Sequence, residues 1–169
     1  MTTYRRMRES DKEQIMNIGR RVFREEDEIP LLHKAIQQCV PELSLVAVED
    51  KTVLGFALVC NKFTKEYYQF LRNIPNCYEL AFIGISPCSQ GRGLGSRLLK
   101  EAIEAIGKAS RQFTCWLVVD DINPSAARLY EKFGFRRWAE TEATLYPGHI
   151  MGLSHRRYRE MIQPSCRIH

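Results

Sequence analysis

The sequence has no apolar run long enough to cross a membrane. Its longest apolar stretches, of which Val53 to Cys60 is one, are far shorter than the roughly 20 residues of a membrane-spanning helix. The first residues, MTTYRRMRES, are polar and lack the apolar segment of a secretion signal. We therefore expect an intracellular, cytoplasmic protein that is not attached to a membrane.

The six cysteines show no pattern typical of disulfides or metal sites. No two of them form a C-x-x-C pair, which fits a reducing compartment. Only Cys166 and His169 approach the spacing of metal ligands, and a structural zinc site needs about four converging side chains. The sequence therefore predicts no metal cofactor.

The chain also lacks a strong charge of one sign. Its 25 Lys and Arg against 20 Asp and Glu give a formal charge of +5, and the two signs are mixed along the chain. Near the C-terminus, Arg156, Arg157 and Arg159 are interleaved with Glu160, and only Tyr158 stands among them as a base-stacking aromatic. We therefore expect no nucleic-acid partner and rank a nucleotide or nucleic-acid binder last among the alternatives.

What is present is an ordinary globular chain of 169 residues, 44% hydrophobic and 27% charged, without repeats. Ser10 and Glu13 form a capping-box pattern, and Asp50-Lys51 is a turn between two β-rich segments. The alternation of periods predicts the α/β (mixed α+β) class, a mixed sheet with helices on its faces. The predicted strands cover 3–7, 43–49, 52–61, 77–86, 113–119, 136–145 and 149–154, and the predicted helices cover 10–23, 31–40, 94–106 and 124–133.

A glycine-rich loop between a strand and a helix is the most informative local feature. It reads Gln90-Gly91-Arg92-Gly93-Leu94-Gly95. Glycines let consecutive amides turn outward, and the positive end of the following helix lies at the same place, so the loop suits a phosphate or pyrophosphate. It is neither a Walker loop nor a G-x-G-x-x-G fingerprint, and a purely structural turn is the alternative.

Two motifs resemble the GNAT superfamily of acyl-CoA-dependent N-acetyltransferases. The pyrophosphate loop of that family, Q/R-x-x-G-x-G/A, is matched by Gln90, Gly93 and Gly95. Its later signature, N-x-x-A-x-x-L-Y-x-x-x-G-F, is matched in order by Asn123, Ala126, Leu129, Tyr130, Gly134 and Phe135. The matching stretch covers about 80–135, and the order of the predicted elements fits the rest.

The resemblance implies a single N-acetyltransferase domain over 1–169, with a central sheet splayed at its middle strands. Its acceptor side would be 1–76, its acetyl-CoA-binding core 77–135, and its C-terminal strands and tail 136–169. The strand before the loop carries a bulge in this family, and Gly84 is suggestive because a strand glycine often marks a bulge or a close backbone approach; a packing glycine is the alternative. The implied coenzyme contacts are Ile83, Gly84, Ile85, Gln90, Gly91, Arg92, Gly93, Leu94, Gly95, Ser96, Asn123 and Tyr130.

The resemblance also implies catalytic roles. Tyr130 matches the family's general acid for the leaving thiolate, and Glu79 has the placement of the glutamate base in histone-acetylating members. An exposed strand glutamate is the alternative for Glu79. His149 and Tyr146 are weaker candidates for the acceptor end, and the acidic run 25–28 either attracts a cationic acceptor or is a solvated face.

The resulting expectation is an N-acetyltransferase that uses acetyl-CoA and no metal. The acceptor is a primary amine (a small amine, a polyamine, a lysine or a peptide N-terminus) that attacks directly in a ternary complex. We expect a monomer or homodimer. The main alternative is a non-catalytic acyl-CoA-binding sensor that keeps the loop but has no productive acceptor pocket.

Overall fold

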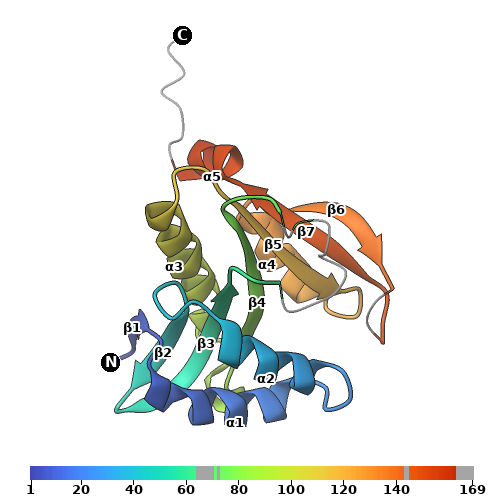
Figure 1. Cartoon of the computed structure of the whole chain (residues 1–169). Helices are drawn as coiled ribbons and strands as arrows, with labels where there is room; N and C mark the ends of the chain where they lie inside the picture. The colour runs from blue at the N-terminus through green and yellow to red at the C-terminus, as the bar shows by residue number, and fades with distance from the viewer. Residues whose placement is uncertain (64–70, 72, 143–144, 163–169) are drawn as a thin grey trace.

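The computed structural model describes residues 1–63, 71, 73–142 and 145–162. Over these residues the chain forms a seven-stranded mixed sheet with helices on both faces, as predicted (Figure 1). The strands are β1 (Thr3–Arg6), β2 (Leu45–Glu49), β3 (Thr52–Cys60), β4 (Cys77–Ile85), β5 (Thr114–Asp120), β6 (Arg136–Thr141) and β7 (Gly148–Ser154), and the helices are α1 (Lys12–Val22), α2 (Glu28–Gln38), α3 (Leu94–Ala109), α4 (Pro124–Lys132) and α5 (His155–Ile162).

The strand order is β1-β2-β3-β4-β5-β7-β6. The pair β4 and β5 is parallel, and the other neighbouring pairs are antiparallel. Strand β7 lies between β5 and β6, so β6 forms one edge of the sheet. The β4–β5 pair is therefore interior and joins the N-terminal strands to the C-terminal ones.

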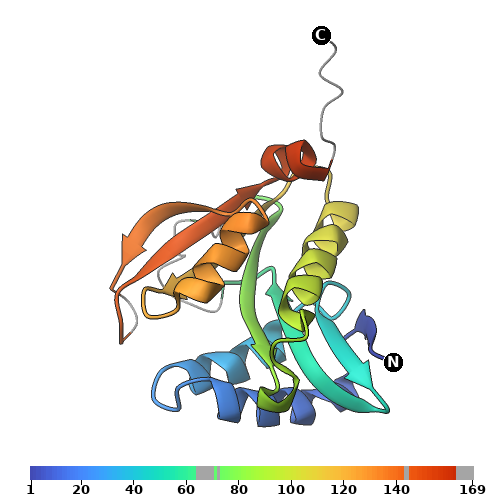
Figure 2. The ribbon, with the colours of Figure 1, turned by 180° about the vertical axis from the view of Figure 1, so that it is seen from behind.

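The two faces of the sheet carry separate cores. Helices α1 and α2 cover one face, where Ile15, Leu32 and Phe56 are fully buried. Helices α3 and α4 cover the other, where Leu98, Ile106 and Leu117 are buried (Figure 2). The 3.6-residue spacing of apolar side chains on α1 and α3 produces this arrangement, because it gives each helix one stripe to bury.

The predicted turn at Asp50-Lys51 is confirmed, and the ends of α4 have the residues and conformations typical of helix caps. Asp50 and Lys51 both have positive φ and connect β2 to β3 in a hairpin. The Asn123 side chain accepts a hydrogen bond from the Ala126 amide at the start of α4, with Pro124 as the first helical residue. Gly134, just after α4, has φ +93°.

The predicted capping box at Ser10 and Glu13 is wrong. Asp11 takes that place: its carboxylate accepts the amide of Arg8 at 2.8 Å and two bonds from the Arg5 guanidinium at 2.7 and 2.8 Å. Both Asp11 and Glu13 follow Ser10 in the sequence. Arg5 on β1 pairs with Asp11, which is buried, whereas Glu13 is exposed.

Other differences are at the ends of elements. Helix α2 begins at Glu28, earlier than predicted, and His155–Ile162, described from sequence only as a basic tail, is the helix α5. No helix in the described ranges has the length and apolar character needed to pass through a membrane. Cys166 and His169 lie outside the described residues.

Candidate functional site

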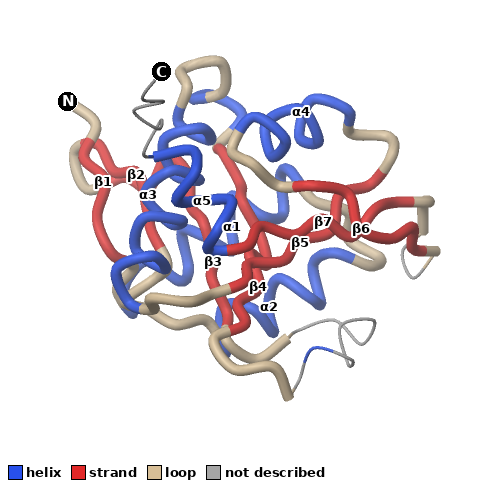
Figure 3. The backbone as a smooth tube through the Cα atoms, turned by 90° about the horizontal axis from the view of Figure 1, so that it is seen from above, coloured by secondary structure: helices blue, strands red, loops and turns tan. Residues whose placement is uncertain are grey.

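The central feature of the fold is a gap between β4 and β5. These strands pair only where Cys77–Glu79 meets Thr114–Trp116, although β4 continues to Ile85 and β5 to Asp120. Figure 3 shows α4 and α2 on opposite sides of the sheet near this gap. Beyond the last pair the strands diverge and leave a cleft of about 540 Å³. Its walls come from β4, β5, α4, the first turn of α3 and the segment between α1 and α2.

A bulge in β4 accompanies this divergence. Leu58 of β3 pairs with Phe82 and Val59 pairs with Leu80, so Ala81 is the extra residue. Bulges bend a strand and increase its local twist, which turns the following part of β4 away from β5. The bulge is thus at Ala81 and not at Gly84.

The hydrogen-bonding direction of β4 follows from one contact at its end. The Ser86 amide donates to the Leu54 carbonyl of β3. Because neighbouring residues of a strand point their backbone groups to opposite sides, Gly84 also faces β3, whereas Ile83 and Ile85 face the gap. A Cβ on Gly84 would lie 2.7 Å from the ring of Phe56, so this glycine makes room for an aromatic side chain.

The glycine loop reaches the cleft at Gly95, which lines it. Gly91 and Gly93 have φ of +76° and +75°, a conformation that favours glycine, and no heavy atom lies within 4 Å of a Cβ built on either. Gly93 is the N-cap of α3 and provides no side-chain cap, so the first-turn amides of α3, Gly95 and Ser96 among them, lack the intrahelical acceptors that later turns have. The loop therefore presents open donors at the positive end of a helix of 16 residues.

The polar side chains of this loop already have partners within the protein. Arg92 lies 3.3 Å from the Glu49 carboxylate and also contacts Thr2, and its hydrogen bond lowers the pKa of Glu49. Gln90 Nε2 lies 3.5 Å from the Ile85 carbonyl oxygen, at the limit of a hydrogen bond. An anion at the loop would thus draw mainly on backbone amides.

Tyr130 and Asn123 line the α4 wall of the cleft. Tyr130 packs edge-on against Phe135, with ring centroids 6.0 Å apart. Burial raises the pKa of its phenol to about 12. Tyr130 therefore stays protonated at neutral pH, and its phenol can act as a hydrogen-bond donor.

Glu79 lies where β4 and β5 separate. It pairs with Cys60 on one side and Trp116 on the other, and its side chain is fully buried. Because this side chain is fully buried, the exposed-glutamate alternative is wrong. Glu79 is also not among the residues that line the cleft, so the structure does not bring it to the cleft surface beside Tyr130.

A charged cluster that the sequence only partly indicated lies at the mouth of the cleft. The Arg24 guanidinium donates to Asp27 at 2.9 and 2.7 Å and to Asp120 at 2.8 Å, and the Arg24 amide donates to Glu28 at 2.7 Å. The ring of Tyr146 lies 4.9 Å from Arg24 Cζ. Three carboxylates thus surround one guanidinium. Burial raises the pKa of one of them, Glu28.

Sequence reasoning found half of this cluster. Asp27 and Glu28 belong to the acidic run and line the cleft, whereas Glu25 and Glu26 are exposed. Asp120 was not predicted, because its 96-residue separation from Arg24 leaves no local signal. His149 instead bonds Asp121 at 2.7 Å and does not line the cleft.

The comparisons with known proteins agree with this geometry. The model of the acetyltransferase (GNAT) family matches residues 12–135. A mycothiol acetyltransferase of Renibacterium salmoninarum is 36% identical over 69 residues, which are 41% of this chain and 20% of that protein. The N-alpha-acetyltransferase RimI of Mycobacterium tuberculosis is 39% identical over 66 residues, 39% of each chain. The matched part thus spans well under half the length of these relatives.

Solved structures share the fold over most of the chain. The ribosomal-protein-S18-alanine N-acetyltransferase of Escherichia coli has a TM-score of 0.70 at 21% identity, covering 91% of this chain and 94% of its own. A chain of the NatC complex bound to Gag peptide and CoA has a TM-score of 0.74 at 19% identity, covering 90% and 98%. At such identities the likeness concerns the fold.

Proposed function

This chain belongs to the GNAT acetyltransferase family, and we propose that it moves an acetyl group from acetyl-CoA to a primary amine by direct attack in a ternary complex. The observation that carries the proposal is the cleft between β4 and β5. The amides at the start of α3 reach it at Gly95, β4 and β5 line it where they no longer pair with each other, and a protonated tyrosine lies in one wall.

The coenzyme would bind mainly through backbone groups. We place its pyrophosphate over the amides of 91–96, where the loop and the start of α3 leave donors open. Its pantetheine arm, which carries amides, would pair with Ile83 and Ile85 as an additional strand would. Gln90, Arg92 and Asn123 would be peripheral contacts, and Gly84 would act through packing.

The reaction requires an unprotonated amine. A primary amine has a pKa near 10 in water, so it must first lose a proton. Its nitrogen then attacks the thioester carbonyl carbon, for which a β4 amide facing the gap would stabilise the oxyanion. As the carbon–sulfur bond breaks, the nitrogen loses its second proton to the base or to solvent, the amide product keeps the acetyl group, and coenzyme A leaves as a thiolate.

Tyr130 would assist that departure by donating a hydrogen bond to the sulfur. A thiol has an ordinary pKa near 8.5, several units below the value of about 12 for Tyr130. Full proton transfer from the phenol to the thiolate is therefore uphill. We propose that Tyr130 stabilises the thiolate and that solvent supplies the proton afterwards.

The proton acceptor would be a carboxylate. The resemblance points to Glu79, and the cleft adds Glu28, which lines it and whose pKa is raised by burial. A raised pKa makes Glu28 the stronger base once it is ionised. Glu28 is therefore a candidate for the base from its place in the cleft, and Glu79, which does not line the cleft, is a candidate from the resemblance alone.

We propose an acceptor amine with positive charge close by. Asp27, Glu28 and Asp120 together exceed the single charge of Arg24 at the cleft mouth. Two of the similar proteins are named as a ribosomal-protein-S18-alanine N-acetyltransferase and a mycothiol acetyltransferase. Peptide N-termini with basic second residues, polyamines and lysine peptides are accordingly the first acceptors to test.

Calorimetric titration tests the proposal. Acetyl-CoA and desulfo-CoA should both bind, ATP should not, and the acetyl-CoA complex should acetylate at least one of the cationic amines. Absence of acetyl-CoA binding would overturn the coenzyme assignment. Binding without transfer to any amine would instead support the acyl-CoA sensor.

A further inference from the structure

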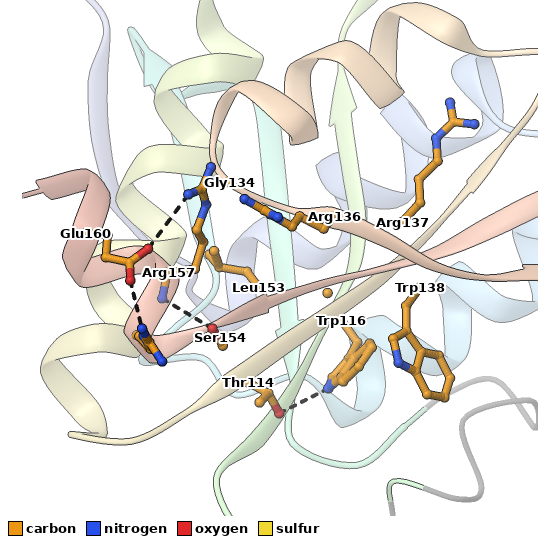
Figure 4. Close-up of a pocket in the computed structure, with 12 residues that line it drawn as sticks. Thr114, Trp116, Gly134, Arg136, Arg137, Trp138, Leu153, Ser154, Arg157 and Glu160 are labelled. Atoms are coloured by element: carbon orange, nitrogen blue, oxygen red, sulfur yellow. Dashed lines mark hydrogen bonds and ion pairs between the residues drawn. The ribbon is translucent and has the colours of Figure 1, made fainter.

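A second cleft of about 430 Å³ lies at the edge of the sheet, beside β6 and α5. It shares no residue with the cleft between β4 and β5. Both tryptophans of the chain, Trp116 and Trp138, line it together with four arginines and a single glutamate (Figure 4). The arginines are Arg136, Arg137, Arg156 and Arg157, and the glutamate is Glu160.

Trp138 owes its position to a bulge in the edge strand. Arg137 pairs with Met151 and Ala139 pairs with Ile150, so Trp138 is the extra residue and its side chain is re-aimed. It remains 59% exposed while its ring meets Trp116 edge-on, with centroids 5.5 Å apart. A large indole surface is thus held toward solvent on a fixed element.

Trp116 is held in place from two sides. Its Nε1 donates to Thr114 Oγ1 at 3.0 Å. A Cβ on Gly152 of β7 would lie 2.8 Å from its ring, so the glycine lets the indole lie flat on the neighbouring strand. The tryptophan pair is therefore a preformed aromatic platform.

The arginines of this cleft retain unbalanced positive charge. Arg156 and Arg157 share Glu160, at 3.2 and 3.7 Å. Within the described ranges Arg136 has no ion-pair partner, and the buried Nε of Arg157 has no hydrogen-bond partner. The guanidinium of Arg136 thus remains available for an anionic ligand that enters the cleft, and Arg156 and Arg157 together carry one positive charge more than Glu160 balances.

We propose that this cleft binds single-stranded nucleic acid, with a base stacked on Trp138 and backbone phosphates at Arg136, Arg156 and Arg157. Sequence-tolerant binding of single strands combines a basic groove with stacking aromatic side chains. The sequence argued against such a partner because Tyr158 alone stood among the basic residues. The fold removes that objection, because it brings Trp116 from β5 and Trp138 from β6 to the arginines of α5.

An acidic peptide would use only part of this surface. It would pair with the guanidinium groups, but it would gain nothing from an exposed indole face. A single-stranded nucleic acid carries both planar bases and phosphates, so it can use the indole and the guanidinium groups together. The proposal is independent of acetyl transfer, since the two clefts have no common residue.

Intrinsic fluorescence tests the proposal directly, because both tryptophans lie in this cleft. Titration of the whole chain with oligouridylate or oligothymidylate should quench the emission, with an affinity that falls as salt concentration rises. Absence of quenching by both oligonucleotides at low salt would overturn the proposal.

Substitutions of Trp138 and Arg136 distinguish the contribution of base stacking from that of positive charge. Binding is measured by the anisotropy of a labelled oligonucleotide. Trp138→Ala should weaken binding about fivefold or more, and Trp138→Phe should recover most of the loss. Arg136→Gln should weaken binding and lower its salt dependence, whereas Arg20→Gln, an equal loss of charge on the exposed surface of α1, should change neither by more than the general charge effect.

Two outcomes would contradict the assignment in these variants. Unchanged affinity in Trp138→Ala would exclude stacking, and equally effective competition by polyglutamate would show a site for acidic chains in general. Acetyl-CoA affinity should be the same in every variant, so failure here is distinguishable from failure of the proposed acetyltransferase activity.

Discussion

At the scale of single residues, the proposed roles of Tyr130, Glu28 and Glu79 can each be tested by one substitution. Tyr130→Phe removes one hydroxyl and keeps the ring contact with Phe135. We expect kcat to fall about 100-fold or more, because the proposed hydrogen-bond donor to the leaving thiolate is lost. The acetyl-CoA dissociation constant should stay within about twofold. Steady-state kinetics with calorimetry measures both, and equal losses in binding and turnover would contradict the role.

The identity of the base can be read from pH profiles of Glu79→Gln and Glu28→Gln. A carboxylate base must be ionised, so kcat/KM rises with pH through its pKa. If Glu28 is the base, the acidic limb should lie above the ordinary glutamate range, because burial raises the pKa of Glu28, and Glu28→Gln should remove that limb. Its persistence in Glu28→Gln and loss in Glu79→Gln would assign the base to Glu79. Tyr130, with a pKa of about 12, should contribute no alkaline limb below about pH 11.

At the scale of elements, substitutions in the glycine loop distinguish a structural role of the loop from a role in binding acetyl-CoA. A Cβ on Gly95 meets only Ile85 Cγ1, at 3.8 Å, and alanine is the better helix former, so Gly95→Ala should leave the free protein as stable or stabilise it by up to about 1 kcal/mol. The same methyl group projects from a residue that lines the cleft, so acetyl-CoA affinity should fall at least tenfold.

Gly93→Ala provides the contrast within the same loop. Its φ of +75° strains any L side chain, so the free energy of unfolding should fall by about 1 kcal/mol, although the space around it is open. Urea denaturation measures the stability of both variants, and calorimetry measures their affinity for acetyl-CoA. A Gly95→Ala variant that binds acetyl-CoA normally would show that the loop is only a turn.

The junction of β1 and α1 depends on Asp11, whose side chain is 4% exposed. Burial alone would raise its pKa, but hydrogen bonds from Arg5 and the Arg8 amide lower the pKa below its ordinary value. Because the folded-state value is the lower one, this contribution to stability is present above about pH 4 and is lost as the pH falls below it.

Asp11→Asn should therefore lower the free energy of unfolding by about 2 kcal/mol at neutral pH, with a smaller difference from wild type near pH 3. Denaturant midpoints across this range measure the difference. Glu9→Gln, which removes an exposed carboxylate close by, should change stability little. A pH-independent loss in Asp11→Asn would contradict the ion-pair explanation.

At the scale of the whole molecule, the sheet is interrupted at its centre. Beyond Glu79 the strands β4 and β5 have no mutual pairing, so a bound coenzyme would connect the two halves of the sheet. At a concentration 100 times its dissociation constant, a ligand stabilises the folded state by about 2.7 kcal/mol. For a chain of this length the melting temperature should rise by about 5–10 °C.

Thermal melting with acetyl-CoA, and with ATP as the control, measures this shift. An equal shift with ATP would mean that the loop accepts polyphosphates in general, and no shift at saturating acetyl-CoA would contradict binding in the gap. Hydrogen exchange should slow at Ile83 and Ile85 in the complex, because their amides face the gap.

The sequence by itself determined the local features of this protein. The turn at Asp50 and Lys51, the cap at Asn123 and the glycines of the 90–95 loop depend on backbone preferences of neighbouring residues, and the periodicity of the helices marks their buried faces. These were enough for the fold class and for the glycine loop, because both depend on short-range patterns, whereas the coenzyme was implied only by the resemblance to a family.

Only the tertiary structure decided which distant residues meet. Arg24 reaches Asp120 across 96 residues, the bulge lies at Ala81 and not at the strand glycine, and Trp138 joins the arginines of α5. Strand order and register bring these groups together, and neither leaves a trace in local composition. Burial of Glu79 likewise follows from the packing of the whole sheet, which a strand's own alternation does not fix when both of its faces are covered.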